Sequence, residues 1–260
     1  MSQILFPYGS LAGMTVLRDL ERAHRLGFQG VEILITPAAM SHRKEARALA
    51  GRLGLTIHYR QAWSRAEDST HPLNVVADLF SALPRDGYRL DEHIPNDLEE
   101  PVMVRADRWQ EAVGHPNYWL GAYGMPWDAF LDLLELVRNF SVVFNTRLYL
   151  KRKLGVREIE DLPRNPTVLL AHLAEGWKQL RHLVREIHLG DCTPGRGRLM
   201  GRNVFPGTGI IPLQAFCDLV RRSGWEGTIV PEVDPFSMGI DDASIIQLRQ
   251  KVEDLMAGKG

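Results

Sequence analysis

Cysteine is scarce in this sequence, because the 260 residues contain only Cys192 and Cys217. Two cysteines exclude the disulfide framework that stabilises many small secreted proteins. The first residues also lack the basic segment and the apolar run of a secretory signal peptide. We therefore expect a reduced, cytoplasmic location.

Long apolar runs and an excess of one charge are absent as well. No apolar run approaches the roughly 20 residues that a membrane-spanning helix needs. The 31 Lys and Arg residues face 32 Asp and Glu residues, which gives a formal net charge of −1 at pH 7. Proteins that bind a phosphate backbone usually carry a basic surface. The composition thus argues against a membrane or nucleic acid as the partner.

The sequence lacks the residues of two common kinds of site, a dinucleotide-binding fingerprint and a nucleophile beside a base. The Gly-x-Gly pieces at 195–197 and 207–209 do not lie between a first strand and its helix, as a dinucleotide-binding fingerprint requires. No Ser, Cys or Lys stands out as a nucleophile beside a base.

Short apolar runs and amphipathic segments do alternate regularly along the chain. This pattern predicts strands at 4–8, 30–35, 55–59, 88–93, 118–122, 141–145, 184–189 and 228–233. It predicts helices at 14–26, 41–53, 72–83, 127–137, 167–181, 213–223 and 241–256. Eight strands in alternation with helices indicate one (β/α)8 TIM barrel domain over residues 1–260, with parallel strands. The proline-rich and acidic segment 94–116 is expected to form a lid, with a helical turn or two around 104–113.

Polar residues stand at the ends of two predicted strands. Residues two apart in a strand share a face, so Glu186 and His188 lie opposite Ile187 and Leu189. The apolar pair should meet the outer helices, which points His188 into the barrel mouth, and the same parity applies to Glu232. An imidazole and a carboxylate together suit Mn, Co, Zn or Fe. The alternative is that the two side chains only form structural hydrogen bonds.

Residues 184–234 also carry a family pattern. His-Leu-Gly-Asp at 188–191 is followed by an Arg-bearing loop, Pro-Gly-x-Gly at 206–209, a helix, Gly-Trp-x-Gly at 224–227 and an apolar strand that ends in Glu232. This order resembles the last third of the xylose isomerase-like TIM barrels, which include sugar isomerases, ketose 3-epimerases and abasic-site nucleases. In the sugar-converting members, a Glu, an Asp, a His and a Glu at the ends of strands five to eight bind one metal.

The resemblance implies roles for several residues, but the ligand set is incomplete. His188 and Glu232 match the last two ligands and are our candidates for catalysis and metal binding. Asn145 stands at the Asp position, and residues 121–124 contain no carboxylate. The pocket charge falls from −3 to about −1, which weakens binding of a divalent cation and leaves two-base epimerisation without support. Asn145 and Asp191 are therefore candidates for substrate binding.

Further candidates lie at other strand ends and loops. His58 and His93 end the predicted third and fourth strands, where abasic-site nucleases and some hydrolases of the superfamily also place histidines. Joined to His188 and Glu232, they would favour zinc or iron. Arg198 and Arg202 follow the seventh strand and suit phosphate or carboxylate, and the resembling epimerases use an Arg at the position of Arg202 near substrate. Trp63 could stack on a sugar.

These residues are compatible with three functions. The first, which we expect, is a sugar or sugar-phosphate isomerase/epimerase-like enzyme with a drifted metal site and a carbohydrate-like substrate. The second is a metal-dependent hydrolase or phosphodiesterase built on the histidines, and the third is a non-catalytic barrel that binds a small molecule. The sequence leaves the oligomeric state open, a homo-oligomer included.

Overall fold

The computed structural model describes residues 2–9, 16–35, 37–61, 98–106, 109–110, 117–122, 125–137, 140–156, 161–193, 203–233 and 241–259. The strands are β1 (Gln3–Gly9), β2 (Gly30–Leu34), β3 (Thr56–Arg60), β4 (Val102–Arg105), β5 (Tyr118–Gly121), β6 (Ser141–Asn145), β7 (Val184–Cys192), β8 (Asn203–Val204) and β9 (Thr228–Glu232). The helices are α1 (Val16–Arg25), α2 (Pro37–Ser41), α3 (Arg43–Leu53), α5 (Trp127–Leu136), α6 (Thr146–Lys153), α7 (Pro166–Leu180), α8 (Leu213–Arg222) and α10 (Asp242–Ala257).

The strand order confirms the predicted fold class. The described strands follow one another as β6-β5-β4-β3-β2-β1-β9-β7-β8, and β6 also pairs with β7. β8 is a two-residue strand antiparallel to β7, which leaves eight strands in the main sheet. These eight parallel strands alternate with helices as a closed (β/α)8 TIM barrel. Among the described residues, none of the helices has the length and apolar content that a membrane span requires.

The chain divides into two compact units, which we describe separately. The larger unit holds residues 1–4, 105–107 and 119–260, and the smaller unit holds residues 5–104 and 108–118. In the smaller unit, β2 pairs in parallel with both β1 and β3, and Glu32 lies beside His58 in the β2–β3 register. α3 ends at Gly54, whose φ of 69° is a left-handed conformation that glycine adopts without strain.

The fourth strand differs from the prediction. β4 pairs with β3 through Tyr59 beside Val102 and Arg60 beside Met103, and its four residues are buried. It therefore occupies part of the segment 94–116, in which 3-10 helical residues at 106, 109 and 110 agree with the helical turn expected around 104–113, and the lid stays a prediction. The run follows Pro101 in a proline-rich and acidic segment, and that composition indicated a loop instead of a strand. The helix predicted at 72–83 and the strand predicted at 88–93 lie outside the described residues.

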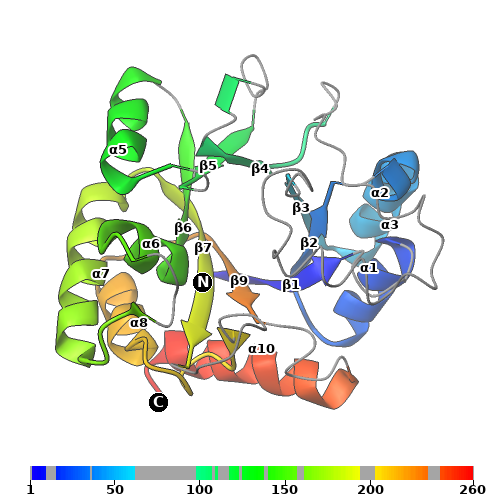
Figure 1. Ribbon diagram of the computed structural model, residues 1–260. Coiled ribbons are helices and arrows are strands. Elements are labelled where there is room, and N and C mark those ends of the chain that lie inside the picture. Colours follow the sequence, from blue (N-terminus) through cyan, green and yellow to red (C-terminus); the bar gives the residue numbers. More distant parts are fainter. Residues whose placement is uncertain are drawn as a thin grey trace. The chain divides into compact units, whose positions relative to one another are not determined.

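In the larger unit, helices α5 to α8 lie along one side of β6 and β7 (Figure 1). Their contact with the sheet is aromatic. Phe144 of β6 stacks on Phe216 of α8 with ring centroids 5.6 Å apart, and Trp177 of α7 meets both rings edge-on. All three side chains are fully buried, so they anchor the outer face of β6 and fix the direction of its last residue, Asn145.

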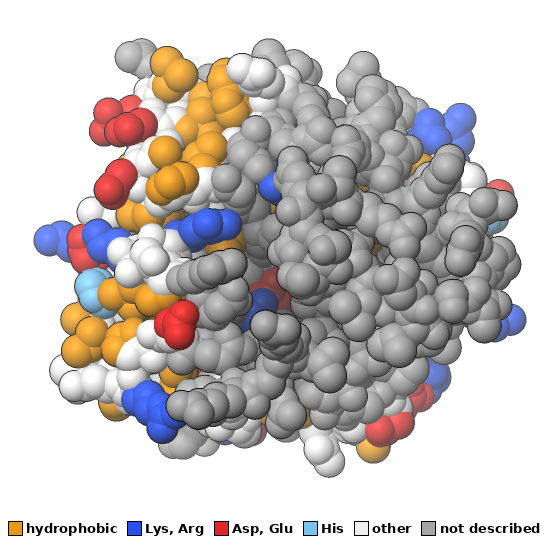
Figure 2. Space-filling view, in the orientation of Figure 1, with side chains coloured by type: hydrophobic (Ala, Val, Ile, Leu, Met, Phe, Trp, Pro, Cys, Tyr) orange, Lys and Arg blue, Asp and Glu red, His pale blue; other side chains and the backbone are white. Residues whose placement is uncertain are grey.

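A helix that was not predicted begins directly after β6. The side chain of Asn145 accepts a hydrogen bond from the N–H of Leu148 at 2.9 Å, which makes Asn145 the N-cap of α6. On the face drawn in Figure 2, charged side chains of both signs alternate with hydrophobic ones along the edge that α5, α6 and α7 form.

Candidate functional site

Strand register places the candidate residues of the larger unit on one face. Glu186, His188 and Gly190 of β7 lie beside Thr228, Val230 and Glu232 of β9, respectively. On the other side of β7, His188 lies beside Asn145. Because side chains two apart in a strand share a face, Glu186, His188 and Glu232 point the same way, as the sequence predicted.

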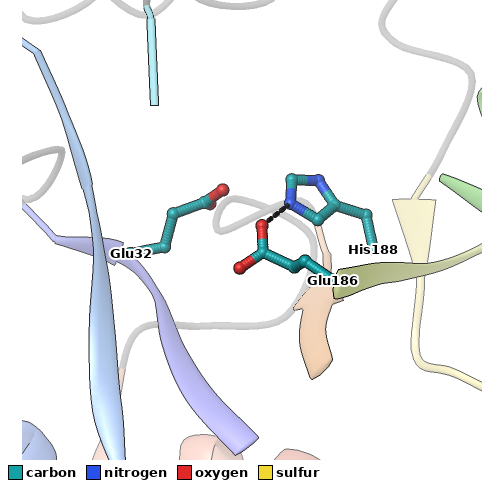
Figure 3. Close-up of side chains that lie close together, drawn as sticks. All are labelled: Glu32, Glu186 and His188. Atoms are coloured by element: carbon teal, nitrogen blue, oxygen red, sulfur yellow. Dashed lines mark hydrogen bonds and ion pairs between the residues drawn. The ribbon is translucent and has the colours of Figure 1, made fainter. Parts of the chain in front are cut away.

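His188 and Glu186 form a buried pair on β7. The Nε2 atom of His188 lies 2.8 Å from Oε1 of Glu186, and both side chains are buried (Figure 3). A carboxylate at this distance accepts a hydrogen bond from Nε2–H and so favours the tautomer with the proton on Nε2 and holds the orientation of the ring. The second nitrogen, Nδ1, then faces Glu232, whose Oε1 is 3.9 Å away. Glu32, which Figure 3 also draws, belongs to the smaller unit.

Glu232 ends β9 between donors of the larger unit. Its Oε2 accepts a hydrogen bond from Nδ2 of Asn145 at 2.8 Å and forms an ion pair with the Arg147 guanidinium at 3.6 Å. Only 5% of Glu232 is exposed, so these partners act where water screens little. Gly190 provides the space, because a Cβ at that position would lie 3.2 Å from Oε2 of Glu232.

The two bonds of Asn145 settle how its amide is turned. The N-cap bond needs an acceptor, so the Oδ1 atom faces the N–H of Leu148. The NH2 group must therefore face the carboxylate of Glu232. At this position the side chain is a hydrogen-bond donor toward the site, whereas the Asp of the resembling enzymes would be an anion.

Arg147 is a residue of the site that the sequence reasoning missed. It follows the N-cap of α6 by two residues, and its side chain is 19% exposed beside Glu232. The rule that residues two apart share a face applies only within a strand. It therefore gives no direction for a residue in the first turn of the helix that follows. The available signal was its place two residues beyond the end of β6, at the edge where barrels hold their active sites.

Thr146 holds the ends of β6 and β7 together. Its buried hydroxyl donates a hydrogen bond to the carbonyl of Gly190 at 2.8 Å and accepts one from the N–H of Gly190 at 3.1 Å. The residues on either side of Thr146 are Asn145 and Arg147. This clamp therefore fixes the backbone from which both partners of Glu232 arise.

Asp191, a candidate for substrate binding, accepts hydrogen bonds from backbone N–H groups of the residues that follow β7. Its Oδ2 accepts the N–H groups of Gly207 and Gly209, and its Oδ1 accepts those of Cys192 and Ile211, at 2.8 to 3.1 Å. Burial raises the pKa of Asp191, and these N–H groups oppose that rise. The carboxylate thus shapes the turn of residues 205–211 beside the site.

The donors around Glu232 do not suit a divalent cation bound to that carboxylate. The acceptor atom of Asn145 is engaged in the N-cap, and the Arg147 guanidinium lies against Oε2 of Glu232. A divalent ion about 5 Å from a guanidinium would be repelled by about 7 kcal/mol at an effective dielectric constant of 20. The Glu186–His188 pair is different, because metal-binding histidines commonly carry a carboxylate on the second nitrogen.

In the smaller unit, polar side chains also lie along the sheet. Glu32 of β2 forms a buried ion pair with Arg60 of β3 at 3.5 Å, and His58, two residues before Arg60, is 6% exposed. Glu32 was not among the predicted site residues. The remaining candidates, His93, Trp63, Arg198 and Arg202, lie outside the described residues, so their roles stay predictions.

Comparison with solved structures shows the fold. The chain is similar to a xylose isomerase domain protein from Alicyclobacillus acidocaldarius subsp. acidocaldarius, with 17% identity, a TM-score of 0.60 and 100% of both chains covered. It is also similar to a D-tagatose 3-epimerase-like protein, with 12% identity, a TM-score of 0.61 and 100% and 98% coverage. For an L-ribulose 3-epimerase the values are 14%, 0.60, 100% and 96%.

These likenesses confirm the resemblance to xylose isomerase-like TIM barrels at the level of the fold. Comparisons with protein-family models and with curated protein sequences found no match. Because one barrel fold supports many reactions, the activity has to be argued from the residues of the site.

Proposed function

We propose that the protein is a sugar isomerase/epimerase-like enzyme that moves a proton on a carbohydrate-like small molecule. The proposal is carried by the placement of Glu232, a buried carboxylate at the carboxyl end of a barrel strand, with Asn145, Arg147 and His188 around it. Two solved structures of similar fold, an L-ribulose 3-epimerase and a 3-keto-D-glucoside 4-epimerase, are named for reactions of sugars.

In this proposal Glu232 is the base. Its carboxylate takes the proton from the carbon next to the substrate carbonyl, and the electron pair of that C–H bond forms a C=C bond while the carbonyl oxygen becomes an oxyanion. Return of the proton to carbon completes the exchange. His188 lies 3.9 Å from Oε1 of Glu232 and is held by Glu186, so it is placed to pass a proton to or from the same substrate.

Two parts of the expected substrate class stay predictions. A phosphorylated sugar depends on Arg198 and Arg202, and a stacked sugar ring depends on Trp63. All three lie outside the described residues. The hydrolase hypothesis depends on His93, which lies there as well, so no observation favours it over proton transfer.

Proton exchange in D2O tests the proposed function. Pentuloses, hexuloses and the matching aldoses are incubated with the protein, and loss of the 1H signal next to the carbonyl is followed by NMR. We expect deuterium incorporation into at least one sugar and a decrease of 10²-fold or more in the rate for Glu232→Gln. The matched control is Glu135→Gln, on an exposed position of α5, which should keep the full rate. Exchange by Glu232→Gln at the wild-type rate, or no exchange on any sugar, would contradict the proposal.

A further inference from the structure

The described residues around Glu232 carry an inference about how the site works. Two cationic or donor groups, the Asn145 amide and the Arg147 guanidinium, meet the same oxygen of Glu232, Oε2, at 2.8 and 3.6 Å. The other oxygen, Oε1, lies on the side of His188. The carboxylate is therefore held and partly neutralised on one side, while the oxygen suited to take a proton faces the other.

We propose that Arg147 supplies the positive charge of this site in place of a divalent metal on Glu232, and that its guanidinium binds the substrate oxygen that becomes the oxyanion. The proposal rests on the proposed function and names the residue that would stabilise its transition state. It draws on three observations of the larger unit: the ion pair with Glu232, the partial exposure of the Arg147 side chain, and the N-cap that turns the Asn145 amide.

The geometry suits this role. An arginine presents five N–H groups in a plane, so it can contact the carboxylate of Glu232 and still offer N–H groups to a second oxygen. The Arg147 side chain is 19% exposed and the Glu232 side chain is 6% exposed, so the guanidinium is the more accessible of the two groups to a bound substrate. When Glu232 takes the proton from carbon it loses its charge, and the negative charge moves to the substrate oxygen. The guanidinium then interacts with the new anion, which lowers the energy of the transition state.

The charge balance supports the same role. Among these described residues of the larger unit, Glu186 and Glu232 contribute −2, Arg147 contributes +1 and a neutral His188 contributes nothing, which together give −1. Three carboxylates and a neutral histidine would give −3, which is what holds a divalent ion strongly. Because Arg147 already supplies one positive charge, a divalent ion at Glu232 would gain little electrostatic free energy and would be repelled by the guanidinium.

Metal titration tests the proposal without any need for turnover. Binding of Mn²⁺ is measured by calorimetry on the wild type, on Glu232→Gln, and on the double variant Asn145→Asp/Arg147→Met. We expect the wild type and Glu232→Gln to bind Mn²⁺ equally, because a metal held elsewhere does not depend on Glu232. The double variant should gain at least 10-fold in affinity, and adding Glu232→Gln to it should remove the gain. A wild-type Mn²⁺ site that Glu232→Gln abolishes would overturn the proposal.

The rate of proton exchange in D2O provides a second test of the role of Arg147. Arg147→Met should slow proton exchange by 10²-fold or more, treatment of the wild type with EDTA should leave the rate unchanged, and the exposed-arginine control Arg164→Met should behave as the wild type. Arg147→Lys keeps the charge but not the planar group, and it should recover part of the rate. An EDTA-sensitive rate that Mn²⁺ restores, or full activity of a folded Arg147→Met, would overturn the proposal. If no sugar exchanges but the titration behaves as expected, only the proposed function fails.

Discussion

Asp191 offers the sharpest test of how the site is built. Its two oxygens accept four backbone N–H bonds, two on each oxygen, from residues that precede and form the turn 205–211. Asp191→Asn keeps the shape of the side chain but replaces one oxygen by an NH2 group. Turning the amide over does not help, because either orientation places the NH2 group against two N–H donors.

The cost can be estimated from these bonds. Hydrogen bonds to a charged group contribute about 1.5 to 3 kcal/mol each, so loss of two bonds costs about 3 kcal/mol or more. Burial raises the pKa of Asp191, which means that the carboxylate is itself disfavoured by desolvation, and a neutral amide recovers part of that penalty. We therefore use the lower value. A loss of about 3 kcal/mol in a domain of this size lowers Tm by about 6 to 12 °C.

The assay is thermal and urea unfolding of Asp191→Asn beside the wild type, followed by circular dichroism at pH 7. Asp132→Asn, at an exposed position of α5, is the matched control and should change the free energy of unfolding by no more than about 0.5 kcal/mol. If Asp191→Asn loses less than about 1 kcal/mol, the carboxylate does not hold the turn as argued, and Asp191 becomes available again as a substrate-binding residue.

Two further changes test the packing and one helix end. Gly176→Ala in α7 would place a methyl group against the ring of Tyr149, whose hydroxyl donates a hydrogen bond to the carbonyl of His172 at 2.8 Å. We expect the free energy of unfolding in urea to fall by about 1 to 3 kcal/mol. The control is Gly51→Ala in α3, where a Cβ meets nothing within 4 Å, and this change should stabilise the protein by up to about 1 kcal/mol. Equal effects of the two substitutions would refute the packing argument. Hydrogen bonds from the N–H and the hydroxyl of Ser244 lower the pKa of Asp241, the N-cap of α10, below its ordinary value of 3.8, so its contribution to stability is present above that pH and is lost as the pH falls through the lowered pKa. Asp241→Ala should therefore lower Tm more at pH 7 than at a pH below the lowered pKa, where the neutral carboxyl still accepts hydrogen bonds, and an equal decrease at both pH values would rule out the charged cap.

Strands such as β6 and β7 could be predicted from the sequence, whereas β4 and α6 could not. Strands such as β6 and β7 carry enough alternating or apolar residues to be recognised, and period two alone placed His188 and Glu232 on one face. β4 is as short as β5, which was predicted, but it follows Pro101 in a proline-rich and acidic segment whose composition indicated a loop. For α6, Asn145 had been interpreted as a changed metal ligand and a candidate for substrate binding, although an Asn directly before a helix is also a good N-cap.

Asn145 and Arg147 are best understood as two parts of one electrostatic arrangement. An Asp at position 145 would bring a second carboxylate to within hydrogen-bond distance of Glu232, and like charges that close need a cation between them. With an amide at 145 that need disappears, and the single charge of Arg147 is enough to balance the single charge of Glu232. The amide at position 145 and the guanidinium at position 147 are thus compatible with each other, because both meet Oε2 of Glu232. Along the sequence, Asn145 was interpreted as a change in the metal-ligand set and Arg147 was missed, because only the turn from β6 into α6 brings both side chains onto the same oxygen atom of Glu232.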